Sequence, residues 1–179
     1  MKIDKSISVK KGNLYGLLLG LITITLLSSL YIVIWGITQF QIGLRIFFRD
    51  QGYIFLIISI VGLIIHELIH GLSWQLIGNN TSNSVKYGID WKTLTPYAHL
   101  KKPIQARSYC WGIAMPGLLL GILPAFFSIL LGNGWLLSFG ILFTLVAGGD
   151  MLVLLLLRKV KAETLVKDHP KRIGCYIIH

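Results

Sequence analysis

The sequence predicts an all-α polytopic membrane protein with four transmembrane helices and a small β-hairpin between the second and third helices. Of its 179 residues, 54% are hydrophobic and only 13% are charged, and a soluble domain of this size could not bury so much apolar surface. Four apolar runs are each long enough to cross a bilayer core, which takes roughly 20 helical residues. A segment with the alternation of a β-strand lies in the connection between the second and third runs.

The four apolar runs define one membrane-embedded domain that extends over residues 1–179. We expect the spans at about residues 13–36, 53–78, 109–131 and 135–157, followed by a cytoplasmic tail over 158–179. The first run follows Lys10 and Lys11, but it is longer than a signal-peptide core and no small-residue cleavage pattern follows it. We therefore expect it to be a retained helix.

The distribution of basic residues predicts the orientation of the spans. The net charge is +10, and lysine and arginine concentrate before the first run, between the second and third runs, and after the fourth. By the positive-inside rule, both termini of this multi-pass protein of the cell membrane are cytoplasmic, and the pair Arg45 and Arg49 alone opposes this orientation. The loops would lie against anionic headgroups of the bilayer. No basic element is interleaved with aromatic residues, so we expect no nucleic-acid partner.

The connection between the second and third runs contains the expected hairpin. Residues 85–92 alternate between apolar and polar side chains, which is the period of a half-buried strand, and residues 97–100 could return beside them. Two interpretations are open. The hairpin either tethers two helices at the surface or offers an exposed edge to an extended substrate segment by β-augmentation.

Two acidic residues lie inside the apolar runs, Glu67 in the second and Asp150 in the fourth. A carboxylate in the bilayer interior costs several kcal/mol unless it is paired, neutralised or bound to a cation. At 1.5 Å per residue, Asp150 and the histidines beside Glu67 would lie at one depth, about 20–25 Å from the outer surface. Small residues would let these two spans approach closely: Gly71, Gly148 and Gly149. We infer that the two acidic positions share a cation.

The cation is expected to be zinc. The sequence His66-Glu67-Leu68-Ile69-His70 places two imidazoles one helical turn apart, with a carboxylate beside them. His66 and His70 can both bind Zn²⁺, and Asp150 would be the third ligand, which leaves a fourth position for water. Zinc lowers the pKa of such a water to about 7, and Glu67 is placed to accept its proton and pass it to the leaving nitrogen.

Other histidines and acids compete for a place in this site. His99 could help to bind substrate, although a solvated loop histidine is the alternative. The stretch Asp168-His169-Pro170 pairs a carboxylate with an imidazole, but its polar and basic setting favours a surface turn or a lid that faces the cytoplasm.

The pattern of His66-Glu67-Leu68-Ile69-His70 with Asp150 resembles the core of site-2-type intramembrane metalloproteases. The chain more closely resembles the small bacterial putative zincin peptidase family, formerly a domain of unknown function. That resemblance covers roughly residues 60–178 and rests on further stretches: Tyr97-Ala98-His99, Met115-Pro116-Gly117, Gly149-Asp150, Asp168-His169-Pro170 and Gly174-Cys175-Tyr176. It implies that zinc is bound by His66, His70 and Asp150, with Glu67 as the catalytic acid and base.

Together these features predict a zinc-dependent intramembrane endopeptidase that hydrolyses a peptide bond of a membrane protein or membrane-associated peptide. Two other classes of protein could use the same residues. A transporter would need a polar path that continues to the outer face, and the first and third runs offer few polar groups for one. A non-catalytic membrane metal-binding protein would have no need of Glu67 as a base. The sequence specifies neither the substrate nor the oligomeric state.

Overall fold

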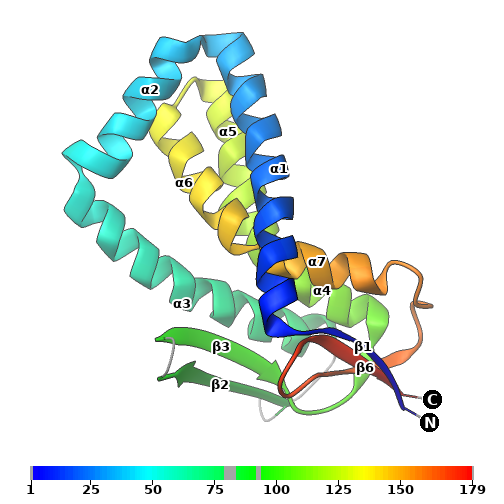
Figure 1. The fold of residues 1–179 in the computed structure, drawn as a ribbon. Coiled ribbons are helices and arrows are strands. Elements are labelled where there is room, and N and C mark those ends of the chain that lie inside the picture. The colour runs from blue at the N-terminus through cyan, green and yellow to red at the C-terminus, as the bar shows by residue number, and fades with distance from the viewer. Residues whose placement is uncertain (1, 79–83, 92–93, 179) are drawn as a thin grey trace.

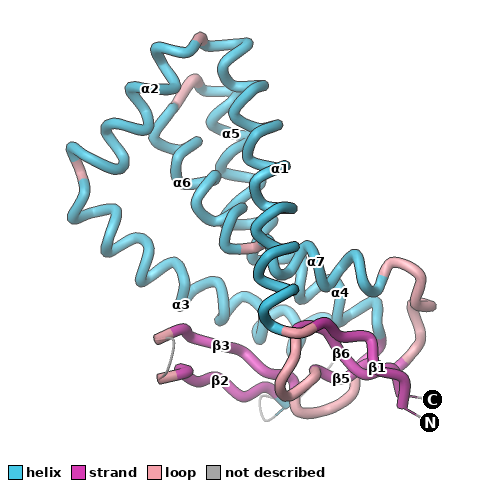
Figure 2. Tube along the Cα trace, in the orientation of Figure 1, coloured by secondary structure: helices cyan, strands magenta, loops and turns pink. Residues whose placement is uncertain are grey.

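The structure, a computed structural model, describes residues 2–78, 84–91 and 94–178. The chain is mostly helical and carries two small β-sheets (Figure 1). The strands gather at the end of the molecule where the two termini lie side by side, and the helices extend away from them (Figure 2).

Three helical segments are long and apolar enough to cross a membrane, or four if one bent pair of helices counts as a single span. The three are α1 (Val9–Trp35), α3 (Gly52–Ile77) and the segment Ala106–Leu131, and the bent pair is α6 (Gly134–Val146) with α7 (Gly148–Leu157). These bounds differ by at most four residues from the predicted ones. The apolar composition that suggested a membrane protein is thus present as helices of membrane-spanning length.

The fourth predicted span, residues 135–157, is not one straight helix, because α6 and α7 meet at an angle of 50°. The break falls at Ala147, between the end of α6 and two glycines, where helix propensity is low. Gly148 lies so close to α1 that a Cβ there would sit 2.2 Å from the carbonyl oxygen of Gly16. The bend therefore accompanies a backbone-to-backbone contact that a larger side chain would prevent.

The third span is also irregular. Helix α4 (Ala106–Pro116) continues through the π-helical turn η3 (Gly117–Ile122) into α5 (Leu123–Leu131). Pro116 lies at the junction, and a proline removes a backbone donor from the helical ladder. The connection after α1 is helical as well: α2 (Ile37–Arg45) leads into a second π-helical turn, η1 (Ile46–Asp50).

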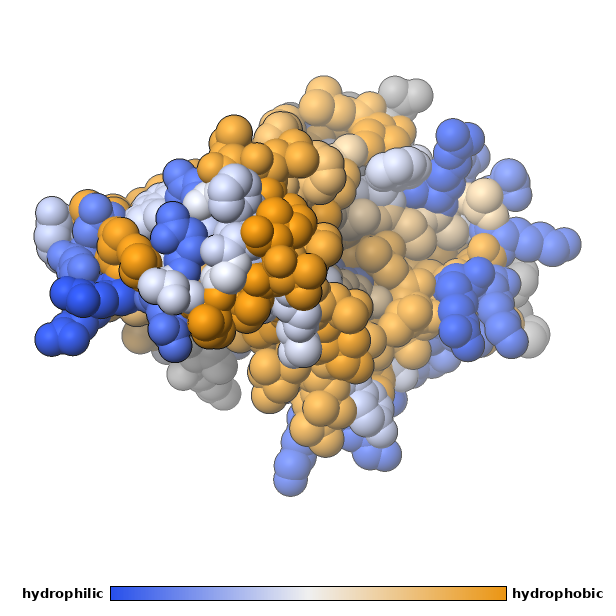
Figure 3. Space-filling view, turned by 90° about the horizontal axis from the view of Figure 1, so that it is seen from above, coloured by the Kyte–Doolittle hydropathy of each residue, from blue (hydrophilic) through white to orange (hydrophobic). Residues whose placement is uncertain are grey.

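Helices α1 and α3 expose apolar side chains over most of their length, and only 11% of the most apolar window of each is buried. Seen from above, apolar surface covers much of the molecule, with hydrophilic residues toward its margins (Figure 3). Such a surface fits a hydrocarbon solvent and is consistent with a membrane protein.

The smaller sheet lies in the connection between α3 and α4. Strand β2 (Val85–Asp90) pairs antiparallel with β3 (Thr95–Leu100), in a register that sets Val85 opposite Leu100 and Tyr87 opposite Ala98. Strand β3 packs against α3, so this sheet covers one side of the second predicted span.

The sequence did not predict the larger sheet, which adds four strands to the mostly helical fold and places two of them within the predicted tail, residues 158–179. Its four strands follow the order β1-β6-β5-β4. They are β1 (Lys2–Ile7), β4 (Ile104–Gln105), β5 (Leu165–Asp168) and β6 (Ile173–Ile178). Lys2 pairs with Ile178, so the two ends of the chain form adjacent strands. Local periodicity could not show this sheet, because its strands are short and β1 pairs across nearly the whole sequence.

A hydrophobic core joins this sheet to the helices near it. Trp74 of α3, Tyr109 of α4, Leu100 of β3 and Val166 of β5 are all at most 2% exposed and belong to one cluster. This core fixes α3 and α4 relative to both sheets, and the geometry of the site described next depends on those two helices.

Candidate metal centre

One face of α3 carries the histidines of the site. Gly62, His66, His70 and Trp74 recur every four residues, and all of them are buried. A Cβ on Gly62 would lie 2.0 Å from the ring of Phe143, so this glycine lets α6 approach the face one turn before His66. The face is buried because α4, the hairpin and the side chain of Phe143 cover it, while much of the rest of α3 is exposed.

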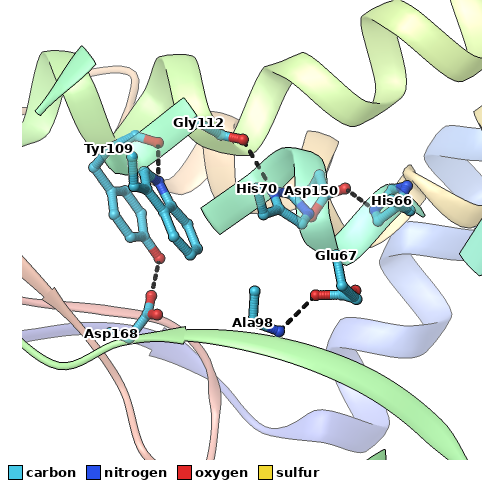
Figure 4. Close-up of polar contacts among 9 residues, drawn as sticks. His66, Glu67, His70, Ala98, Tyr109, Gly112, Asp150 and Asp168 are labelled. Atoms are coloured by element: carbon cyan, nitrogen blue, oxygen red, sulfur yellow. Dashed lines mark hydrogen bonds and ion pairs between the residues drawn. The ribbon is translucent and has the colours of Figure 1, made fainter. Parts of the chain in front are cut away.

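The carboxylate of Asp150, in the first turn of α7, reaches both histidines (Figure 4). Its Oδ2 lies 3.1 Å from Nε2 of His66, and its Oδ1 lies 3.4 Å from Nε2 of His70. The two imidazole side chains are only 5% and 6% exposed. The structure thus brings Asp150 to two histidines that lie 84 and 80 positions earlier in the sequence.

A backbone contact fixes the hydrogen on His70. Its Nδ1 lies 2.9 Å from the carbonyl oxygen of Gly112 in α4. A carbonyl oxygen can only accept, so Nδ1 carries the hydrogen, and in the neutral ring Nε2 then presents a lone pair. That lone pair faces an oxygen of Asp150, which is also an acceptor. Two acceptors in contact require a proton or a cation between them.

The donor atoms fit a zinc ion. Zinc bonds of about 2.0–2.1 Å at tetrahedral angles place neighbouring ligand atoms about 3.3 Å apart. The two measured separations between imidazole nitrogen and carboxylate oxygen are 3.1 and 3.4 Å. A ligand histidine that donates its other nitrogen to a carbonyl, as His70 does to Gly112, is the usual arrangement at zinc sites. Nδ1 of His66 is buried without a hydrogen-bond partner among the described residues.

Glu67 lies beside this set and is held by the hairpin. Its Oε2 accepts a hydrogen bond of 2.7 Å from the backbone N–H of Ala98 in β3. The ligand atoms of His66, Glu67 and His70 lie within 4.8 Å of one another. One carboxylate oxygen of Glu67 is therefore fixed by the backbone, and the carboxylate keeps further acceptor capacity beside the two histidines.

The sequence predicted that glycines would let α3 and α7 pack closely, and this prediction is wrong. Gly148 contacts Gly16 of α1, and Gly71 contacts the hydroxyl end of Tyr87 in β2. Helix α7 packs mainly against α1 and α4. Asp150 reaches the histidines from the start of α7, just after the 50° bend, so close packing of two straight spans is not needed.

The competing stretch Asp168-His169-Pro170 lies away from His66 and His70. His169 and Pro170 begin the turn from β5 to β6, as predicted, but Asp168 itself is buried. Asp168 ends β5 and is 9% exposed. Its Oδ1 lies 2.5 Å from the hydroxyl of Tyr109, and its Oδ2 accepts a hydrogen bond of 2.7 Å from the N–H of Leu100. Burial raises the pKa of this carboxyl above its ordinary value of 3.8, although these hydrogen bonds and His99 oppose the shift.

His99 also lies apart from His66, His70 and Asp150. Its Nδ1 is 3.5 Å from Oδ2 of Asp168, and its side chain is 31% exposed. It lines an open cavity of about 800 Å³ over the hairpin, together with Lys86 and Tyr97. In β3 it alternates with Ala98, whose N–H meets Glu67, so a role for His99 in substrate binding would involve this cavity and not the metal ligands directly.

Sequence reasoning missed the residues that support the histidines. The ring of Trp74 stacks on His70 at 5.6 Å and on Tyr109 at 5.6 Å, and its Nε1 donates to the carbonyl oxygen of Tyr109. The spacing of four residues from His70 to Trp74 was a usable signal, since it continues the face that carries both histidines. Gly112 and Ala98 act through their backbones, and no side-chain pattern reveals such contacts.

Comparison with known proteins bears on this geometry. A family model described as "Putative zincin peptidase" matches residues 59–165, which is more than half of the chain and includes both histidines, Glu67 and Asp150. The chain belongs to this family. No curated protein and no solved structure gave a significant match.

Membership in the zincin peptidase family identifies zinc as the metal of the chain, and His66, Glu67 and His70 form a possible site for it. The family also indicates a metallopeptidase. Its fold here is mostly helical, with three or four helices able to cross a membrane.

Proposed function

We propose that this zincin peptidase is an intramembrane endopeptidase that hydrolyses a peptide bond of a membrane protein or membrane-associated peptide. The observation that carries the proposal is the position of the site. Two histidine nitrogens and the Asp150 carboxylate converge at the spacing of zinc ligands, and they do so between helices whose outer faces are apolar.

The residues would divide the chemistry as follows. His66, His70 and Asp150 hold zinc, which when bound supplies Lewis-acid activation of a water molecule. Glu67 takes the proton of that water on its carboxylate and returns it to the nitrogen of the leaving peptide. The N–H of Ala98 keeps the Glu67 side chain directed toward β3, so the base has one orientation relative to the two histidines.

The pairing of β1 with β6 supports four spans with both termini on the cytoplasmic side. Two ends of a chain that form adjacent strands must lie on the same side of a membrane, which requires an even number of crossings. Counting α6 and α7 as one bent span gives four. The basic residues outside the spans then favour the cytoplasm for both ends.

The hairpin is the part of this site best placed to meet an extended substrate. Strand β3 passes beside the metal ligands, as the contact from Ala98 to Glu67 shows. We propose that a locally unfolded segment of the substrate lies along this hairpin, where backbone hydrogen bonds would align it with the site.

The variant Glu67→Gln tests the proposed function. It removes the base and preserves the size of the side chain, so the purified protein should retain zinc and lose peptide hydrolysis. The measurement is a comparison of membrane proteomes from cells that carry the wild-type or the variant protein, in which an uncut precursor should accumulate. Cleavage that continues in the variant would contradict the mechanism. If the protein were a metal transporter, it would cleave no substrate, and the two proteomes would show no difference in precursor. The same comparison therefore also tests that alternative.

A further inference from the structure

A second groove lies apart from the metal centre, between α4 and α7. It has a volume of about 420 Å³ and lies between the start of α4 and the end of α7 with the segment that follows. Its walls are mainly apolar or small, and they include Trp111, Ala114, Leu154 and Leu157. None of these residues belongs to the set at His66 and His70, so the proposed hydrolysis makes no use of the groove.

Two arginines stand at one end of this groove. Arg107 lies in the first turn of α4, and Arg158 directly follows α7. Both side chains are exposed, and within residues 2–78, 84–91 and 94–178 neither forms an ion pair with an acid. Glu163 is the acid nearest to Arg158 in the chain, and it pairs with neither arginine. The two positive charges are therefore available to a ligand.

The position of the groove relative to the helices suggests what that ligand is. Ala106 begins one candidate span, and Leu157 ends the bent pair that forms another. The arginines thus lie where apolar helix gives way to polar chain, which is the level of lipid headgroups. Trp111, which is 47% exposed, has the amphipathic character typical of residues at that level. The apolar walls below the arginines lie at the level of acyl chains.

We propose that the groove between α4 and α7 binds one anionic phospholipid. The phosphate group is held by Arg107 and Arg158, and an acyl chain lies along Ala114 and Leu154. Guanidinium groups match phosphate oxygens with paired, charge-assisted hydrogen bonds, and basic pockets between helices at the cytoplasmic surface suit anionic headgroups. A zwitterionic lipid adds a positive group next to the arginines and is bound less well.

Backbone contacts hold the two sides of the groove together. The N–H of Arg107 donates to the carbonyl oxygen of Ala162 at 3.0 Å, and the N–H of Ala106 donates to that of Thr164 at 2.8 Å. The segment after α7 is thereby tied to the start of α4. A bound lipid would add a further link between α4, which carries Gly112, and α7, which carries Asp150.

The test measures lipid retained by the purified full-length protein in a neutral detergent, by native mass spectrometry after addition of phosphatidylglycerol or phosphatidylcholine. The wild-type protein should retain phosphatidylglycerol at least about tenfold better than phosphatidylcholine. The double variant Arg107→Gln/Arg158→Gln should lose that preference. Equal retention of the two lipids by the wild-type protein would overturn the proposal.

A matched control tests whether the lipid binds at this groove or is only attracted by the overall positive charge of the protein. The double variant Lys159→Gln/Lys161→Gln removes the same charge from neighbouring exposed positions that do not line the groove, and it should retain phosphatidylglycerol within about twofold of the wild type. An equal loss in both double variants would show that net charge alone attracts the lipid and would overturn the site.

Two further measurements test the apolar part. Ala114→Phe fills the groove and should weaken phosphatidylglycerol binding while both arginines remain, and unchanged binding would contradict the acyl-chain position.

Inorganic phosphate at millimolar concentration should fail to displace the lipid, and displacement would mean that the arginines bind phosphate without the groove. Unchanged zinc content and thermal unfolding would show that each variant is folded. None of these measurements depends on peptide hydrolysis, so they stand or fall separately from the proposed function.

Discussion

Two aspartates of the C-terminal third, Asp150 and Asp168, both lie beside histidines but meet different partners. Asp150 faces Nε2 of two histidines, and on His70 that nitrogen presents a lone pair because Nδ1 donates to Gly112. Asp168 instead accepts hydrogen bonds from a backbone N–H and lies against the hydroxyl of Tyr109. The first site needs a proton or a cation between its facing acceptor atoms, and the second is complete as it stands.

The difference shows why nearness of acids and histidines does not by itself define a metal site. Around Asp168 the protein supplies donors, so the carboxylate is satisfied and its role is to join β5 to β3 and α4. Around Asp150, Nε2 of His70 is an acceptor when the ring is neutral, and a buried acceptor that faces another acceptor is costly. What decides the role of each aspartate is the set of atoms that face it.

The largest effect that we expect from this comparison concerns zinc. Asp150→Ala removes a ligand, and zinc affinity should fall by more than the roughly 10–100-fold that loss of an outer partner costs. Zinc content of the purified protein, measured by mass spectrometry, checks this outcome. The control Asp168→Asn should keep its zinc. If Asp150→Ala retained the full content, Asp150 would leave the ligand set.

The next largest effect concerns folding. Asp168→Ala leaves the N–H of Leu100 buried without its acceptor and the Tyr109 hydroxyl without its partner. At about 1–3 kcal/mol for each of these two unsatisfied groups, the free energy of unfolding should fall by about 2–6 kcal/mol. Thermal unfolding in detergent measures the change. Tyr109→Phe, which removes one of the two partners and keeps the ring stacked on Trp74, should cost less than half as much. An equal loss of unfolding free energy in Asp168→Ala and Tyr109→Phe would contradict the view that Asp168 stabilises the fold through both of its partners.

The smallest effect concerns pH. Because burial raises the pKa of Asp168 above 3.8, the folded protein holds this proton more tightly than the unfolded chain does. Its contribution to stability is therefore full below pH 3.8 and is lost as the pH rises through the folded pKa. The difference in unfolding free energy between wild type and Asp168→Asn should shift by less than the 1.4 kcal/mol per pH unit of one full proton. If the wild type instead became more stable relative to Asp168→Asn as the pH rises above 3.8, the predicted direction of the pH dependence would be wrong.

Much of the site could be predicted from the sequence because its signals are local or are rare in an apolar chain. The spacing of His66 and His70 is a property of one helix, and any α-helix places such residues on one face. Glu67 and Asp150 stood out because acids are expensive in a bilayer, so each needed an explanation before any contact was known. The larger sheet could not be predicted in this way, since Lys2 and Ile178 pair across nearly the whole chain.

The sequence by itself determined that this chain has membrane-spanning helices and that two histidines share a helix face with a carboxylate between them. The reason is that helical period and hydrophobic length are local properties. Only the tertiary structure decided which acid faces those histidines and in what chemical state. That outcome depends on the bend before α7, the carbonyl of Gly112 and the N–H of Ala98, which are backbone features that no side-chain pattern encodes.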